Sequence, residues 1–494
     1  MLLTHFRHLI TGLCLLSLAV LFSYCSDEDF TDSPNDKLEF SIDTLSFDTV
    51  FVQMGSATYD FRVYNPHDSR IRVSKIKLAG GEASPFRINI NGINSTEFND
   101  VEIWAKDSIH VFVEVTVDPT AQNLPFIVND SIVFETNGNT QDVKLRAYGQ
   151  NAHFFGPNTP HGTVIGSTGD TVWTNDLPYV IFDYVVVDSL RKLSIQAGTQ
   201  IHMHNGAVFL VKGTLDVQGG VDTLSKVIFQ GTRLDNDSPY DYREVPGQWY
   251  GIYFDANSVG NHINGAIIKN GYNGITVGQG AATSINNSPN LVIENTNIRN
   301  MAQLGIYNVS GVLLGGNCLV YNCGRHNFMA SGGVSVMGNC TFVNNNNALA
   351  RETPLLKLSS YFNTADFLYV APLQAHFINC IIFGEEVPVE NELAFEKSDD
   401  SSVAYEVLFE NCVIKTKKQA SDTLVNCVLP PFNAYLFDNA SQNDYTPGEN
   451  SPCRNSGKSN YAIDSGTGIV IDLSRDYFGN TRVEPWDIGC IERQ

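Results

Sequence analysis

Basic residues are scarce in this sequence. Among 494 residues there are 31 Lys and Arg against 53 Asp and Glu, which gives a formal net charge of −22. The phosphates of nucleic acids and anionic lipid surfaces both repel a chain of this charge. Nucleic acid is therefore excluded as an expected partner, and attachment to a membrane would need something other than protein charge.

Long amphipathic helical stretches are also absent, and so are the short motifs of several enzyme classes. The sequence has no phosphate-binding loop, no dinucleotide fingerprint and no nucleophile elbow. His202 and His204 alternate in an apolar run, but no third metal ligand stands at a suitable spacing. We therefore expect no metal site and no cofactor, and we expect both histidines to point outward from a strand.

Glycine, by contrast, is abundant, with 40 residues, and only 17% of the residues are charged. Asn, Val, Ile and Phe are also common, which is typical of β-rich chains with many tight turns. The length allows two or three domains with sizeable cores. The composition therefore predicts an all-β protein.

The beginning of the chain is an uncharged apolar run from Leu9 to Phe22, preceded by Arg7. This layout is typical of a secretory signal peptide and is too short for a comfortable membrane span, so residues 1–24 are excluded from the fold. Cys25 and the residues before it resemble the lipobox of bacterial lipoproteins, whose cysteine carries the lipid anchor. The alternative is an ordinary secretory signal with a spare cysteine.

Residues 26–29 read Ser-Asp-Glu-Asp and resemble the acidic export tag of lipoproteins of the Bacteroidota. The resemblance implies a protein in the outer membrane, lipid-anchored and facing the cell exterior. Each buried acyl methylene contributes ~0.8 kcal/mol, so a multiply acylated cysteine would hold the chain without help from protein charge. Residues 25–37 are acidic and cannot bury a core, which predicts a flexible tether.

Residues 38–152 contain short alternating strands separated by turn clusters such as NPHDS and ETNGN. About seven antiparallel strands in roughly a hundred residues fit an immunoglobulin-like β-sandwich. The order YDFRVYNP, SPFRI, DSIHVFVEVTVDP, DSIVFETNG and VKLRAYG also resembles the ASH-like (Hydin-type) sandwiches of bacterial surface proteins. Such sandwiches are spacers or interaction modules, so we expect no chemistry here.

Residues 160–494 repeat a short unit in which an Asn, usually followed by Cys, precedes an apolar pair, as in GGNCLVYNC, MGNCTFVNN and FINCIIFGE. The first three copies are spaced by 22 residues. A period in the twenties without a helical pattern predicts a β-solenoid, here a parallel β-helix. The recurring asparagines are Asn295, Asn317, Asn339, Asn379, Asn411 and Asn426.

Successive coils of a β-helix lie ~4.8 Å apart, so equivalent side chains stack on one another. Stacked asparagines can pass an amide N–H to the carbonyl of the next, which predicts a structural Asn ladder. The neighbouring cysteines would fill a narrow core as reduced thiols, with disulfides between coils as the alternative. Cys453 and Cys490, at the end of the chain, are better placed for a disulfide, and their redox state is left open. The stacked thiols are Cys318, Cys340, Cys380, Cys412 and Cys427.

The segment LSIQAGTQIHMHNGAVFLVKGTLDVQGG, followed by GQWYGIYF and INGAIIKNGYNGITV, resembles the first coils of right-handed β-helix proteins of the pectin-lyase-like superfamily. The end, DLSRDYFGNTRVEPWDIGCIE, resembles the closing motif of bacterial β-helix surface proteins. We expect Asp472, Asp476, Arg482 and Asp487 to form a charged clasp that caps the last coil and hides its open edge. The tandem resembles a broad group of Bacteroidota outer-surface lipoproteins.

The excursion DNDSPYDYREVPGQWYG combines carboxylates, an arginine and aromatic rings that could stack on sugars. A lyase would need a base near a carboxylate-bound cation such as Ca²⁺, and an inverting hydrolase would need paired carboxylates. A solvated loop before an apolar strand is the favoured interpretation. The candidate glycan-binding residues are Asp235, Asp237, Asp241, Arg243, Trp249 and Tyr250.

A second short pattern, Asp followed by Ser or Thr and an aliphatic residue, resembles the O-glycosylation acceptor of exported Bacteroidota proteins. The same pattern also ends turns before strands, so about half of the matches are expected to be structural. The matching positions are Thr44, Thr49, Ser108, Ser131, Thr171, Ser189, Thr223 and Thr423.

Together these features favour a lipid-anchored surface protein that binds glycans or surface proteins. The alternative is a polysaccharide lyase or glycoside hydrolase on the same scaffold, and only the lyase would call for Ca²⁺.

Overall fold

The chain divides into two compact units, Met1–Asn151 and Ala152–Gln494, which are described separately. In the described ranges no helix is long and apolar enough to cross a membrane. The predicted signal peptide and the lipid site at Cys25 lie outside these ranges. The computed structural model describes residues 30–119, 125–156, 162–237, 240–279, 288–345, 351–363, 368–385, 388–418 and 422–494.

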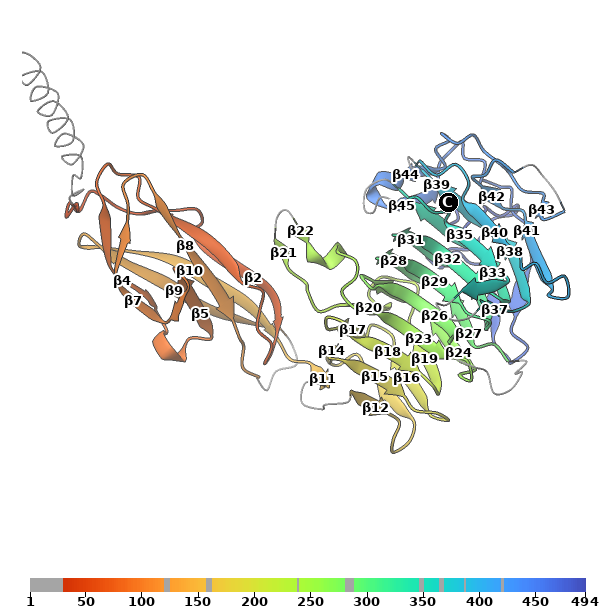
Figure 1. The fold of residues 1–494 in the computed structure, drawn as a ribbon, viewed down its shortest axis with the longest axis horizontal. Coiled ribbons are helices and arrows are strands. Elements are labelled where there is room, and N and C mark those ends of the chain that lie inside the picture. Colours follow the sequence, from red (N-terminus) through yellow and green to blue (C-terminus); the bar gives the residue numbers. More distant parts are fainter. Residues whose placement is uncertain are drawn as a thin grey trace, which may run out of the picture. The chain divides into compact units, whose positions relative to one another are not determined.

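The first unit is a β-sandwich of two five-stranded sheets (Figure 1). One sheet has the order β1(Glu39–Phe40), β3(Tyr59–Tyr64), β8(Ser108–Val115), β5(Phe86–Ile90) and β6(Ile93–Ser95). The other has the order β2(Thr44–Phe51), β10(Asn139–Gln150), β9(Phe126–Thr136), β4(Ile71–Leu78) and β7(Glu97–Ile103).

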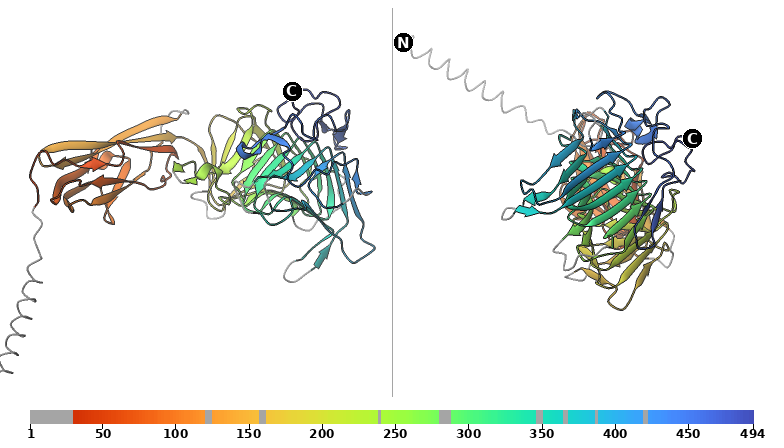
Figure 2. Two further views of the ribbon diagram at one scale, coloured as in Figure 1. Left: turned by 90° about the horizontal axis from the view of Figure 1, so that it is seen from above. Right: turned by 90° about the vertical axis from the view of Figure 1, so that its right-hand side faces the viewer.

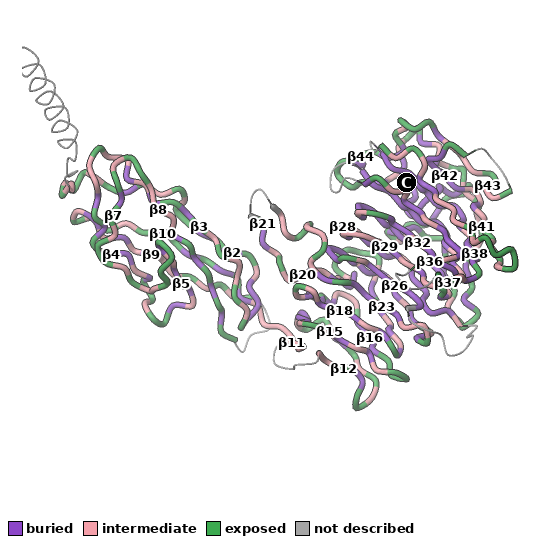
Figure 3. The backbone as a smooth tube through the Cα atoms, in the orientation of Figure 1, coloured by how far each residue is buried: buried purple, intermediate pink, exposed green. Residues whose placement is uncertain are grey.

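Along the strands of the sandwich, buried and exposed residues alternate (Figure 3), as in β10, because successive side chains point to opposite faces of a sheet. The buried faces enclose a core that includes Phe47, Phe86 and Phe134. The strands outnumber the seven expected, and β2 pairs with β10 in parallel, whereas only antiparallel pairing was expected.

The second unit is a parallel β-helix, whose three parallel sheets have strands stacked coil upon coil (Figures 1 and 2). The first parallel sheet contains β11(His153–Phe155), β14(Tyr179–Ile181), β17(Gln200–Met203), β20(Val227–Gly231), β25(Ala266–Lys269), β28(Asn297–Met301), β31(Leu319–Cys323), β34(Thr341–Asn344), β39(Ile381–Gly384) and β42(Val413–Ile414).

The other two parallel sheets follow the same order along the chain. The second contains β12(Thr163–Ile165), β15(Tyr184–Val187), β18(Val208–Val211), β23(Gly251–Asp255), β26(Asn273–Gln279), β29(Leu304–Asn308), β32(His326–Ser331), β35(Leu356–Ser359) and β40(Leu393–Glu396). The third contains β13(Thr171–Trp173), β16(Lys192–Gln196), β19(Thr214–Gln218), β24(Asn261–Asn264), β27(Leu291–Glu294), β30(Val312–Gly316), β33(Gly333–Gly338), β38(Leu373–Ile378), β41(Tyr405–Glu410) and β43(Leu424–Val425).

Four short hairpins and three 3₁₀ turns complete the described elements. The hairpins are β21(Asn236–Asp237) with β22(Tyr240–Asp241), β36(Tyr361–Asn363) with β37(Leu368–Val370), β44(Phe437–Asn439) with β45(Asp444–Pro447), and β46(Ala462–Asp464) with β47(Val470–Asp472). The 3₁₀ turns are η1(Gly81–Ala83), η2(Tyr242–Glu244) and η3(Ala440–Gln442). The predicted all-β fold, a sandwich followed by a parallel β-helix, is confirmed.

Stacking of like residues builds the core of the β-helix. On the inner face of the first parallel sheet, each coil places one buried apolar residue directly above that of the coil before. This column runs through Tyr179, Ile201, Phe229, Ile268, Ile298, Val320, Phe342, Ile382 and Ile414. The apolar area removed from water by such columns is the main favourable contribution to folding.

The repeated asparagines share a backbone conformation. All six have a positive φ, between 48° and 53°, and the glycine one coil before Asn295, Gly265, has a φ of 64°. The chain turns here from the third to the first parallel sheet. Asn enters the left-handed region at lower cost than most residues, so the turn explains the recurring Asn at exposed and buried coils alike.

The amide ladder exists in two segments. Asn295 donates to Asn264 Oδ1 at 2.9 Å, and Asn317 donates to Asn295 Oδ1 at 3.3 Å. In the second segment Asn379 donates to Asn339 Oδ1 at 3.2 Å. No hydrogen bond joins Asn339 to Asn317, because Arg482 donates to Asn317 Oδ1 at 3.0 Å instead.

Beyond these two segments the ladder is absent. Within the described residues, the side-chain amides of Asn411 and Asn426 make no hydrogen bond, and Asn426 is exposed. The ladder therefore forms where the C-terminal segment covers the asparagines.

The thiols of the Asn-Cys units are free and stack inside the β-helix. Each thiol donates to the carbonyl two residues before it, for example Cys340 to Gly338 at 3.3 Å and Cys380 to Ile378 at 3.3 Å. Burial raises the pKa of the Cys340 thiol well above its usual range. Cys453 and Cys490 are also free and buried, so the disulfide considered for them is not formed.

The C-terminal segment, residues 451–494, packs on the flank of the β-helix. Ile463, Ile471 and Leu473 contact the outer face of the third parallel sheet, in a cluster with Leu314. They occupy the space left by glycines in consecutive coils, since a Cβ on Gly316 would lie 2.4 Å from Ile471 Cγ2 and one on Gly338 would lie 2.8 Å from Leu473 Cδ1. The segment thus covers a flank.

The expected clasp across the last coil is wrong. The ionic partner of Arg482 is Glu492, at 3.2 Å, and Asp476 and Asp487 accept backbone N–H groups within the C-terminal segment. Asp472 ends the hairpin β46–β47 and is exposed. These groups hold the segment in shape, because each buried carboxylate needs hydrogen-bond donors.

Asn379 provides a test of what the asparagines contribute. Asn379→Gly keeps the positive φ and loses the bonds to Asn339 and Lys458, which should lower the unfolding free energy by about 1–3 kcal/mol. Asn379→Ala adds strain in the left-handed region and should cost about 1–2 kcal/mol more. Chemical denaturation measures both, with Asn426→Gly as the exposed control. Equal losses for the two variants would show that φ is not the determinant.

The thiol column predicts selective alkylation. Cys427, at the end of the column, is half-buried, and a hydrogen bond from Cys412 lowers its pKa, whereas burial raises the pKa of Cys412. Iodoacetamide at pH 8 should therefore label Cys427 at least about tenfold faster than any other described cysteine in the native protein. Peptide mass mapping measures the order. Cys427→Ser should abolish the fast reaction, and rapid labelling of Cys340 or Cys380 would contradict a closed core.

Candidate functional site

The excursion after β20 uses its carboxylates in ion pairs. Arg233 binds Asp235 through two contacts, of 3.0 and 2.5 Å, and Arg243 binds Asp241 through two contacts of 2.8 Å. The hydrogen bond from Arg243 lowers the pKa of Asp241. Asp241 therefore stays ionised, which is unsuitable for a general acid. The side chain of Asp237 lies outside the described residues.

A second set of contacts fixes the excursion to the outer face of the first parallel sheet. Glu244 Oε1 lies 3.0 Å from Lys269 Nζ, and Glu244 Oε2 lies 3.6 Å from Arg299 Nε and accepts a hydrogen bond from Asn300. Trp249 is 1% exposed, and its indole N–H donates to Lys269 O at 2.9 Å. Trp249 therefore has no face available to a sugar, contrary to the expectation.

Tyr250, in contrast, is exposed and has an aromatic neighbour. Tyr250 is 51% exposed and Tyr272, one coil later, is 44% exposed; their ring centroids are 6.3 Å apart and the rings are nearly perpendicular. The hydroxyl of Tyr253 donates to Tyr250 O at 3.3 Å and accepts from Asn273 at 3.4 Å, which supports the backbone beneath the pair.

The two tyrosines begin a series at one corner of the β-helix, between the first and second parallel sheets. The N–H of Tyr272 donates to Trp249 O at 2.6 Å, that of Gln303 to Tyr272 O at 2.8 Å, and that of Arg325 to Gln303 O at 2.8 Å. We call Tyr250, Tyr272, Gln303 and Arg325 the corner column. Arg325 is exposed and forms no ion pair with a described residue.

A strip on the adjoining second parallel sheet adds further aromatic surface. Tyr253, Thr276, Tyr307 and Met329 occupy equivalent outward positions on successive coils. Burial raises the pKa of Tyr253 and of Tyr307, so both phenols are neutral at physiological pH. Tyr307 lies 3.2 Å from the Ser331 hydroxyl. The corner column and this strip form one surface that is rich in phenols and poor in charge.

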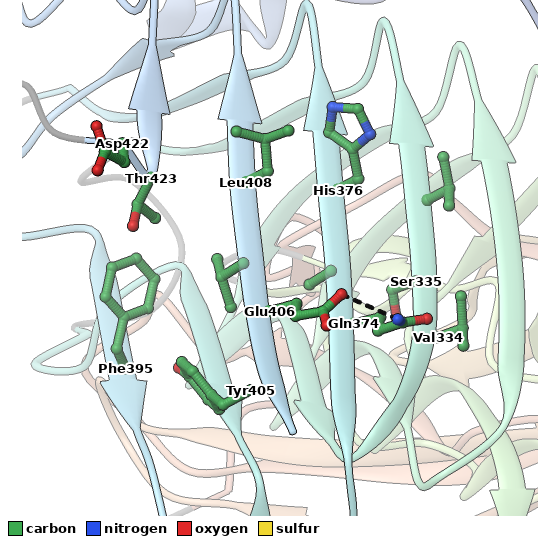
Figure 4. Close-up of a pocket in the computed structure, with 13 residues that line it drawn as sticks. Val334, Ser335, Gln374, His376, Phe395, Tyr405, Glu406, Leu408, Asp422 and Thr423 are labelled. Carbon is green, nitrogen blue, oxygen red and sulfur yellow. Dashed lines mark hydrogen bonds between the residues drawn. The ribbon is translucent and has the colours of Figure 1, made fainter. Parts of the chain in front are cut away.

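A separate hollow of about 610 Å³ lies at the far end of the third parallel sheet (Figure 4). Gln374 donates to Glu406 at 3.0 Å across neighbouring strands. His376 lies 3.4 Å from Glu410, which also pairs with Lys458 at 3.0 Å. Burial lowers the pKa of His376, so this imidazole is neutral at physiological pH. The outer side of the hollow is acidic, whereas its inner side is apolar.

The two histidines of the HMH segment do not meet the expectation in full. His202 is buried, 2% exposed, and burial lowers its pKa to about 4. His204 is half-buried and lies 3.3 Å from Thr232 Oγ1. No group of three or more His, Cys, Asp or Glu in the described ranges could hold a metal ion.

The positions that match the O-glycosylation pattern are accessible to different degrees. Thr44, Ser189 and Thr223 are exposed, and the other five are half-buried. Thr423 lines the hollow of Figure 4, and its backbone carbonyl accepts from Phe409. Glycosylation of these residues stays a prediction.

Tyr272, Gln303 and Arg325 were missed in the sequence. The only signal is spacing: Tyr272 follows Tyr250 by 22 residues, the length of one coil. That spacing alone does not tell which residues lie at a corner.

No family model and no curated protein matches this chain. Among solved structures, a family 123 glycoside hydrolase from Clostridium perfringens matches with 10% identity and a TM-score of 0.17 over 23% of this chain. The chain thus spans about a quarter, 25%, of that structure.

Two further structures match other parts of the chain. The ASH/PapD-like domain of human CEP192 has 10% identity, a TM-score of 0.17, and coverage of 26% of this chain and 91% of that one. The Agl-KA catalytic domain has 12% identity, a TM-score of 0.34, and coverage of 73% and 76%. At these TM-scores none of the matches assigns a function to this chain.

Proposed function

We propose that this protein binds glycans at the cell surface and holds a sugar chain along the flank of its β-helix without cleaving it. The observation that carries the proposal is the exposed pair Tyr250 and Tyr272 on successive coils. The C–H face of a pyranose packs on an aromatic ring, while phenol hydroxyls bond to sugar hydroxyls. Two exposed aromatic rings on successive coils suit such a ligand.

The direction of the corner column supports an extended ligand. Successive coils advance by ~4.8 Å, so the four residues of the column are spread over about 14 Å along the axis of the β-helix. Gln303 and Arg325 supply N–H donors beyond the two rings, which is the composition that recognises hydroxyl groups. A chain of several sugars laid along the flank would meet all four.

Binding is favoured over hydrolysis because the described carboxylates of the excursion are already paired. Asp235 and Asp241 each bind an arginine through two contacts, and Glu244 bridges Lys269 and Arg299. An inverting hydrolase needs one carboxyl group that holds a proton and a second one free to activate water. The excursion therefore serves as a support for the tyrosine pair.

Attachment to the outer membrane through lipidated Cys25 is part of the same proposal. The sandwich would then act as a spacer that carries the β-helix away from the membrane. Exposed Thr44, Ser189 and Thr223 are the O-glycosylation candidates that this proposal favours.

Replacement of the tyrosines tests the binding proposal. Tyr250→Ala and Tyr272→Ala should each weaken binding to glycans by about 2- to 10-fold, since a stacked aromatic ring contributes roughly 0.5–1.5 kcal/mol. A glycan array identifies the ligand, and calorimetry measures the affinities. Tyr435→Ala, which removes another exposed tyrosine of the β-helix, is the matched control. Unchanged affinity in a variant that carries both substitutions would refute this binding site. New reducing ends after incubation of a bound glycan with the protein would show that the protein is an enzyme.

Cys25→Ala tests the membrane anchor. Without the acylated cysteine, the chain loses the acyl burial that would hold it on a membrane, so it should be found in the soluble fraction. Metabolic labelling with a radioactive fatty acid should mark the wild-type protein and leave the variant unlabelled. Label in the variant would refute lipidation at this residue.

A further inference from the structure

The last coil of the third parallel sheet is incomplete. β41 pairs with β38 along its whole length, from Tyr405 to Glu410. On its other edge β43 pairs only with Phe409 and Glu410. Within the described ranges no strand pairs with the outer edge of β41 from Tyr405 to Leu408. Among the described residues, this edge of β41 is therefore unpaired over four residues.

The backbone groups on this edge have a known direction. Leu373 N–H donates to Ala404 O at 3.0 Å, and Phe409 N–H donates to Thr423 O at 2.8 Å. Because residues of a parallel strand bond alternately to the two neighbours, Tyr405 and Val407 direct their N–H and C=O groups toward the open edge. The edge thus offers two donors and two acceptors to an added strand.

The hollow of Figure 4 lies along this edge. Its inner side includes Phe395, Tyr405 and Val407, which are only partly buried although they pack against the core of the β-helix. Its outer side includes Glu406 and Leu408. A strand laid along β41 would place alternate side chains against these two sides, apolar ones inward.

Charge on the outer side favours a basic occupant. Glu406 accepts a hydrogen bond from neutral Gln374, and neither Glu406 nor Asp422 forms an ion pair with a described residue. At the paired end of the strand, in contrast, Glu410 binds Lys458. Lys418 lies over the Phe395 ring, 4.2 Å from its centroid, and shows that an ammonium group fits at this aromatic wall.

We propose that β41 binds an extended peptide segment of a protein partner as an additional parallel strand, and that this segment alternates apolar with basic residues. Backbone hydrogen bonds to Tyr405 and Val407 give affinity, while the apolar hollow and Glu406 select the side chains. The corner column plays no part, so this site is independent of glycan binding.

The experiment uses fluorescein-labelled hexapeptides and the mature full-length protein, with binding measured by fluorescence anisotropy. The sequence Val-Lys-Val-Lys-Val-Lys should bind at least about tenfold more tightly than Val-Glu-Val-Glu-Val-Glu, because the acidic peptide faces Glu406 and Asp422. Lys-Lys-Lys-Val-Val-Val has the same composition without alternation and should also be at least about tenfold weaker. Amide exchange at Val407 should slow on binding.

Two variants test the edge and the charge separately. Val407→Pro removes an N–H that the fold does not use and should reduce binding at least about tenfold. Glu406→Gln retains a side-chain oxygen that can accept the hydrogen bond from Gln374 but removes the negative charge. It should reduce binding of the basic peptide several-fold. Exposed Glu352→Gln is the control for charge. If Val407→Pro fails to fold, a peptide N-methylated at alternate residues is used with the wild-type protein instead. This peptide cannot donate its backbone hydrogen bonds to the edge of β41.

Four outcomes would overturn the proposal. One is no binding of the alternating basic peptide at millimolar concentration. The second is equal binding of Lys-Lys-Lys-Val-Val-Val, which would show attraction by charge alone. The third is unchanged affinity in both variants. The fourth is self-association that Val407→Pro abolishes and the peptide does not inhibit, because the occupant would then be a second copy of this chain.

Discussion

The superposition of successive coils is the constraint on which the β-helix depends. Parallel strands at a spacing of ~4.8 Å put every residue next to its equivalents in the coils before and after. An apolar residue is then packed by other apolar residues, as in the column from Tyr179 to Ile414. A polar residue must find its partner in the same way or be covered from outside. The residue at each position must therefore suit the equivalent residues of the coils before and after it.

The asparagine corner illustrates how two requirements meet in one column. A positive φ recurs at this corner in every coil from Gly265 to Asn426, and Asn426 is exposed, with an amide that makes no described bond. At the buried coils the amides also bond to the C-terminal segment, where Arg482 donates to Asn317 Oδ1 and Asn379 donates to Lys458 O. Backbone geometry therefore explains why Asn recurs, and the amide ladder is an additional gain at the buried coils.

Much of the fold could be predicted because stacking leaves a periodic trace in the sequence. The Asn-Cys units revealed the coils, and the thiols near Cys340 are reduced and buried as expected. The errors concern contacts between distant segments. Trp249 packs into the core of the β-helix, His202 is buried, and Arg482 pairs with Glu492. The candidate site was found only in part, since Tyr250 was identified and the rest of the corner column was not.

The same constraint determines where function can arise. Inside a column, a substitution disturbs the packing of the neighbouring coils. Positions that bind ligands must therefore lie where a side chain or strand edge is not packed against the next coil. The corner of Tyr250 and Tyr272 is such a place, because side chains there point into solvent. The last coil is another, because no described strand pairs with β41 from Tyr405 to Leu408 on its outer edge. The C-terminal segment, which the sequence suggested would close that end, instead fills the space beside Gly316 and Gly338 on the flank. A segment used to cover the flank cannot also supply a further strand, and among the described residues none pairs with the edge at Tyr405 and Val407.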